Sequence, residues 1–245
     1  MSAASGPAGM KRFYSNAAVA TGEGGYRVEL DGRGINTPAG RKLTLPTLPL
    51  AEAVASEWNG QGETIDVHSL RLTRIANSVL DGVLGREAEV AEEIAGYGAS
   101  DLLCYRATGP AELAARQSAS WDPVLEWASD ALGVSLLTTA GITWCEQPET
   151  SLTALRENLG RRNGWELAAL HVMTGLLGSA MLALAHAEGK LTAEEAWAAA
   201  HIDEDWQISQ WGEDYEARKR RENRQADFLA ASRLYALCSG QAFSS

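Results

Sequence analysis

The sequence predicts an α+β protein in which a small antiparallel β-rich N-terminal domain precedes a larger all-helical C-terminal domain. Apolar residues alternate with polar ones between Phe13 and Pro46, as in strands, whereas beyond Pro46 they recur every three to four residues, as in amphipathic helices. The chain has 245 residues, 45% of them hydrophobic, which suffices for a sizeable core. We expect a disordered lead-in at 1–10, a β-meander domain at 11–46, or to about 70 at the longest, and a helical domain at 47–245.

The first domain is predicted to be a small antiparallel meander. Tyr26, Val28 and Leu30 alternate with polar residues, and Asp31-Gly32 is typical of a tight turn. The glycine-rich run 22–25 lacks the lysine and the following helix of a phosphate loop, so it predicts a hairpin turn instead.

The helical domain is predicted to begin with Thr47 as an N-cap and a helix whose apolar stripe includes Trp58. Further on, Ser120 precedes a predicted helix with Pro123 in its first turn, and Thr192 with Glu195 forms a capping box. Four residues are assigned structural roles in these helices: Trp58, Trp121, Pro123 and Trp127.

The most apolar stretch runs from Leu167 to Ala187 and is about long enough to span a bilayer. His171 and His186 interrupt it and no Lys/Arg cluster flanks it, which favours a central core helix over a membrane anchor. From Asp203 to Leu237 the sequence is compatible with one long helix, interrupted in propensity only by Gly212.

Charge and composition exclude several classes of function. There are 21 Lys and Arg against 32 Asp and Glu, so the net charge is −11 and nucleic acid is not an expected partner. The four histidines are scattered singly, and the three cysteines show no paired spacing. We therefore expect no cofactor, no metal site and no catalytic residue.

One cluster of possible ligands keeps an enzymatic alternative open. His201 stands close to Asp203, Glu204 and Asp205, and hard metals accept carboxylates. Acids at a helix start are also explained by the helix dipole alone. A small-molecule or metal-dependent enzyme that uses the acidic cluster around Glu204 is thus the alternative function.

Several motifs that neither packing nor capping demands resemble the assembly chaperones of the ATP synthase alpha subunit, the family of ATP synthase assembly factor 2. They follow the order of that family between about Phe13 and Leu237. The motifs are Thr37 to Gly40, Leu43 to Pro46, Ala55 to Gln61, Asp101 to Arg106, Gln117 to Trp127 and Asp203 to Gly212.

The resemblance implies a non-enzymatic chaperone that binds the unassembled alpha subunit and prevents its aggregation until the beta subunit replaces it. Mitochondrial members carry an Arg-rich leader, whereas only Lys11 and Arg12 precede Phe13 here. We therefore expect a bacterial protein of the cytoplasm, monomeric when free, with a processed protein of the mitochondrial matrix as the second choice.

A reversible chaperone interface should combine a few aromatic anchors with a polar rim. The segment 204–216 has that composition, although Trp211 and Tyr215 lie at helical spacing and would serve a core equally well. The predicted partner-binding residues are Glu204, Trp206, Gln207, Trp211, Gly212, Glu213, Tyr215 and Glu216.

Overall fold

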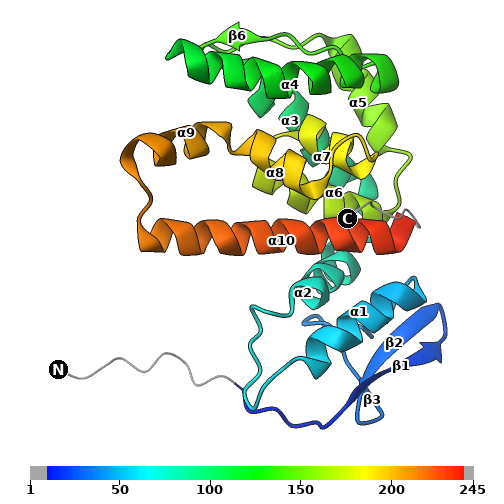
Figure 1. The fold of residues 1–245 in the computed structure, drawn as a ribbon. Helices are drawn as coiled ribbons and strands as arrows, with labels where there is room; N and C mark the ends of the chain where they lie inside the picture. The colour runs from blue at the N-terminus through cyan, green and yellow to red at the C-terminus, as the bar shows by residue number, and fades with distance from the viewer. Residues whose placement is uncertain (1–9, 240–245) are drawn as a thin grey trace. The chain divides into compact units, whose positions relative to one another are not determined.

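The computed structural model describes residues 10–239, which divide after Leu84 into two compact units (Figure 1). Apart from Met10, the expected disordered lead-in lies outside the described residues. The first unit ends well beyond residue 46, because two helices that the sequence assigned to the helical domain belong to it.

The first unit contains a four-stranded antiparallel sheet, as the alternating pattern predicts. β2 (Gly25–Leu30) is central, with β1 (Ala17–Gly22) on one side and β3 (Arg33–Gly34) and β4 (Thr44–Leu45) on the other. Gly22 pairs with Gly25 across a two-residue hairpin turn. Asp31 and Gly32 both have positive φ, at 47° and 79°, which confirms the second tight turn.

Two helices complete the first unit. α1 (Leu48–Asn59) packs on β1 and β2, and the Thr47 hydroxyl accepts a hydrogen bond from the Leu50 amide, which confirms the predicted N-cap. α2 (Arg71–Ser78) continues into a π-helical turn, η1 (Val79–Val83).

The second unit consists mainly of helices. They are α3 (Glu87–Gly98), the short 3-10 helix η2 (Leu102–Cys104), α4 (Ala111–Leu132), α5 (Glu149–Leu159), α6 (Gly164–Leu177), α7 (Ala180–Ala187), α8 (Ala193–Ala200), α9 (Ile202–Trp211) and α10 (Tyr215–Ser239). One short parallel strand pair joins β5 (Tyr105–Arg106) to β6 (Thr139–Ala140). Figure 1 shows α6 and α7 between α10 and α4, and α6 packs against both α10 and α3.

The core of this unit centres on α7, in which all eight residues are buried. Asp101 is also fully buried, and its carboxylate accepts hydrogen bonds from the amides of Leu103 and Met181 at 3.1 and 3.2 Å. It thereby caps the first turns of η2 and α7. Burial raises the pKa of Asp101 to about 6.

Three helix predictions were wrong in their boundaries. The apolar stretch from Leu167 to Ala187 is two helices, because Gly178 adopts a left-handed conformation with φ of 67°. The predicted helix from Asp203 to Leu237 is likewise divided, at Gly212 with φ of 78°. Both breaks redirect the chain at a glycine, where positive φ carries no Cβ penalty.

The predicted helix after Ser120 in fact begins at Ala111, so Ser120 and Pro123 lie inside α4 rather than at its start. Pro123 is exposed, whereas Trp127 is half-buried. Trp121 is only 1% exposed, and its indole N–H donates to the Ala199 carbonyl at 2.8 Å.

Trp58, in the first unit, is half-buried and donates to the Thr73 hydroxyl at 3.2 Å.

No helix within residues 10–239 has the length and apolar character needed to cross a membrane.

Candidate partner-binding site

The predicted partner-binding residues lie on α9, on the link that follows it and on the first turn of α10. α9 begins beside His201, the residue that ends α8, and carries Asp203, Glu204 and Asp205 in its first turn. Acids favour this end of a helix because its free amides carry partial positive charge. None of the residues of α9 is buried, so this helix presents an unusually open surface.

The aromatic residues of the segment are mostly exposed. Trp211 is 79% exposed and Tyr215 is 70% exposed, so the alternative that placed them in the core is wrong. They flank Gly212, whose positive φ ends α9. Trp206 is half-buried, with the Arg116 guanidinium 4.9 Å from its ring centroid.

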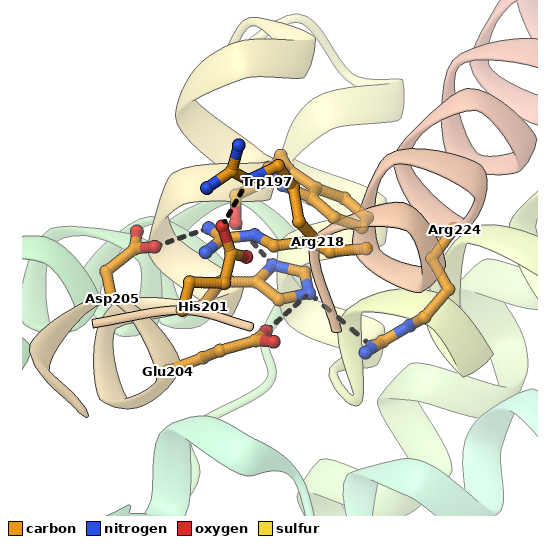
Figure 2. A network of polar contacts seen from close by, with 8 residues as sticks. Trp197, His201, Glu204, Asp205, Arg218 and Arg224 are labelled. Carbon is orange, nitrogen blue, oxygen red and sulfur yellow. Dashed lines mark hydrogen bonds and ion pairs between the residues drawn. The ribbon is translucent and has the colours of Figure 1, made fainter. Parts of the chain in front are cut away.

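A polar network around His201 joins α8, α9 and α10 (Figure 2). The imidazole stacks on the Trp197 ring with centroids 3.9 Å apart, and Nδ1 donates to the Trp197 carbonyl at 2.7 Å. Nε2 faces the Arg224 guanidinium at 3.4 Å. Burial lowers the pKa of His201, so the ring is neutral at pH 7 with its proton on Nδ1.

Two ion pairs attach α10 to the α9 segment on either side of this histidine. Arg221 pairs with Asp205, and Arg218 pairs with Glu213 at 3.0 Å, as Figure 2 shows. Because Arg221 is largely covered, its pair with Asp205 helps to fix the angle between the two helices across the Gly212 break.

Glu204 lies between this network and solvent. Its side chain is 38% exposed, and its carboxylate is 4.0 Å from His201 Nε2, the nitrogen that carries no proton. That contact is therefore not an ion pair at pH 7. Glu204 presents a carboxylate that a partner can reach, next to exposed Gln207 and close to Trp211 along the same helix.

A groove of about 490 Å³ runs along the side of α9 that carries Trp206, Gln207 and Trp211. Its opposite side is formed by the segment Tyr105–Pro110 and by Ile142, which is 98% exposed. None of the predicted partner-binding residues lies on this second side. Tyr105 and Arg106 belong to the motif Asp101 to Arg106, but neither that motif nor the apolar residues of 137–144 had been assigned to a binding surface.

The described residues offer little for metal chemistry. Within residues 10–239 no group of three or more His, Cys, Asp or Glu side chains is placed to hold a metal ion. Asp203 and Asp205 instead point to other partners: Asp203 accepts from Gln117 at 2.6 Å, and Asp205 pairs with Arg221. The alternative of a metal-dependent enzyme at Glu204 thus has no support from the geometry.

Comparisons with known proteins agree with the motifs in the sequence. Residues 11–129 match the family model described as ATP12 chaperone protein. The curated "Protein atp12, mitochondrial" from Schizosaccharomyces pombe is 25% identical over 240 residues, which cover 93% of this chain and 82% of the relative.

Two solved structures are more similar in sequence to this chain than the curated relative is. Atp12 from Paracoccus denitrificans is 37% identical with a TM-score of 0.87, covering 93% of this chain and 98% of that one. A protein of Agrobacterium tumefaciens is 44% identical with a TM-score of 0.89, and the match covers 93% of this chain and 86% of that one. Fold and similarity together define the chain as a chaperone. It belongs to the ATP12 chaperone family, as the resemblance implied.

Proposed function

We propose that this chain is a non-enzymatic assembly chaperone of ATP synthase that binds the unassembled alpha subunit until the beta subunit replaces it. Membership of the ATP12 family supports the class of function. The observation that carries the choice of surface is the exposure of Trp211 and Tyr215 beside an apolar groove and an accessible carboxylate, Glu204.

Such a surface suits temporary protection of a subunit. A subunit destined for a ring exposes apolar interface before assembly, and contiguous apolar surface promotes aggregation. Two exposed aromatic anchors with a rim that includes the exposed Gln207 and Glu216 give a modest interface, which the final partner can displace. Glu213 is largely covered by its pair with Arg218, so its part in this rim is limited. The relatives include a mitochondrial protein and proteins of bacterial species. We propose the bacterial cytoplasm as the place of action, with the mitochondrial matrix as the alternative.

The test is co-expression with the isolated alpha subunit, followed by size-exclusion chromatography. We expect the two chains to co-elute, and the purified chaperone to suppress alpha-subunit aggregation at about one chaperone per client without ATP. Adding the beta subunit should release the chaperone. Failure to co-elute, a requirement for ATP, or protection at far less than one chaperone per client would contradict the proposal.

A matched pair of variants ties the activity to the surface. Trp211→Ala should weaken co-elution, because it removes an exposed anchor without opening a cavity in the core. Val67→Ala, which truncates a residue 57% exposed in the first unit, should bind as wild type does. Equal binding by both variants would remove the assignment of Trp211.

A further inference from the structure

The loop 137–144 presents three large apolar side chains to solvent. Ile142 is 98% exposed, Trp144 is 64% exposed and Leu137 is 51% exposed. Monomeric proteins rarely expose apolar groups so close together without a partner to cover them.

The loop is held in place by its backbone. β6 pairs with β5, the Gly141 amide donates to the Arg106 carbonyl at 2.7 Å, and the Gln147 side chain bonds both the amide and the carbonyl of Leu137. The apolar side chains are therefore presented by an ordered frame, which lowers the entropy cost of binding.

Ile142 from this loop and Trp211 from α9 both line the groove of about 490 Å³. We propose that the loop 137–144 and α9 are the two sides of one docking groove, and that the groove takes an apolar segment of the client flanked by Lys or Arg. This inference rests on the proposed function and specifies which part of the chaperone receives the alpha subunit and by which chemistry.

The groove suits a protein segment better than a small metabolite. Its more buried polar side chains are already engaged: Gln117 accepts from the Ala107 amide and donates to Asp203, and Arg106 pairs with Asp122 at 2.7 Å. Specific recognition of a metabolite needs convergent polar groups that are free to bind it. The exposed apolar groups lie on both sides of the groove, where only a longer ligand covers them together.

The charge of the helical unit argues for basic flanks on the ligand. Residues 1–84 contain eight Lys or Arg and eight Asp or Glu, whereas residues 85–245 contain 13 against 24, so the second unit carries the whole net charge of −11. Within the groove, Arg106 is neutralised by Asp122, while Asp203 is exposed and accepts a hydrogen bond from the neutral side-chain amide of Gln117. Charge complementarity then favours a cationic partner.

The test measures the affinity of the purified chaperone for the isolated alpha subunit. Ile142→Glu should weaken binding at least tenfold, because it replaces an apolar contact with a charge that must lose its water against the apolar segment of the client. Its matched control is Leu229→Glu, which makes the same change at a residue 46% exposed on α10 and outside the groove. The control should bind within about twofold of wild type.

A second variant tests the proposal that the client segment has basic flanks. Asp203→Asn keeps an acceptor for Gln117 but removes the charge, so it should weaken binding and flatten its dependence on salt. If wild type binds the alpha subunit but Ile142→Glu binds equally well, the groove is wrong while the proposed function stands. If Asp203→Asn leaves the salt dependence unchanged, the basic flank is wrong. If wild type does not bind at all, the proposed function fails and this inference fails with it.

Discussion

Glu204 lies in the first turn of α9, 4.0 Å from His201 Nε2, and Arg221 and Arg224 contact its neighbours Asp205 and His201. The variant Glu204→Lys exchanges an acid at a helix start for a base. The acid gains about 0.3–1 kcal/mol from the helix dipole, and the base loses a similar amount. The cost to the free energy of unfolding is thus about 1–2 kcal/mol, because a side chain 38% exposed can turn toward solvent.

A loss of that size leaves the fold intact. Against a total stability of about 5–15 kcal/mol, it should lower the melting temperature by roughly 2–8 °C in a chain of this length. Binding should suffer far more. Removing one partner of a desolvated interfacial charge pair costs about 2–5 kcal/mol, which corresponds to a factor of roughly thirty to several thousand in affinity.

The assay combines circular dichroism, thermal melting and titration with the isolated alpha subunit. Glu194→Lys is the matched control, since Glu194 is an exposed acid in the first turn of α8. Both variants should melt alike, and only Glu204→Lys should lose the client. Normal binding by Glu204→Lys would reduce Glu204 to a solvated helix-start acid. A collapse of the melting transition would instead make the residue structural and remove it from the partner surface.

Three further predictions concern stability. Trp121→Phe should reduce the free energy of unfolding by about 2–4 kcal/mol and lower the melting temperature, because it leaves the buried Ala199 carbonyl without its donor and opens a cavity. An unchanged melting temperature would contradict the burial of this ring. Burial lowers the pKa of His201 below its ordinary value of 6.5, so the unfolded chain binds the extra proton and the folded state loses stability as pH falls below about 6.5. The variant His201→Gln should therefore lose less stability than wild type between melts at pH 7 and pH 5. An equal loss in both proteins would refute this prediction. Trp58→Arg should cost only about 1–3 kcal/mol, since a half-buried site lets the guanidinium reach water, and insoluble or unfolded protein would show that the site is sealed.

Local rules predicted much of the fold. The Thr47 cap, the Thr192 and Glu195 capping box and the hairpin at 22–25 each depend on a few neighbouring residues, and the structure has all three. The break at Gly178 was not predicted, and Gly212 was recognised only as a weak point in one long helix, because apolar periodicity continues through both. The positive φ at each glycine ends the helix there, with a left-handed conformation at Gly178 and an extended ψ at Gly212.

The candidate site was predictable on one side only. The aromatic and acidic residues of α9 are contiguous in sequence, so their composition indicated a surface segment. The opposite side of the groove brings Ile142 next to Tyr105–Pro110 through a parallel strand pair between residues more than thirty positions apart. No local pattern encodes such a pairing, and the two-residue strands are too short to give a period.

The uneven division of charge along the chain has a consequence for timing. Aggregation of a free subunit is a collision between two clients, so it accelerates with the square of their concentration, and the chaperone must arrive first. The net charge of −11 belongs to residues 85–245, so a client with the basic flanks proposed above would be attracted over long range toward the unit that contains α9. Such steering raises association rates from roughly 10⁵–10⁶ toward 10⁸–10⁹ M⁻¹s⁻¹ at low salt without slowing release. Under the proposed function, the charge of the helical unit would thus speed capture of the client without strengthening the hold that hand-over must break.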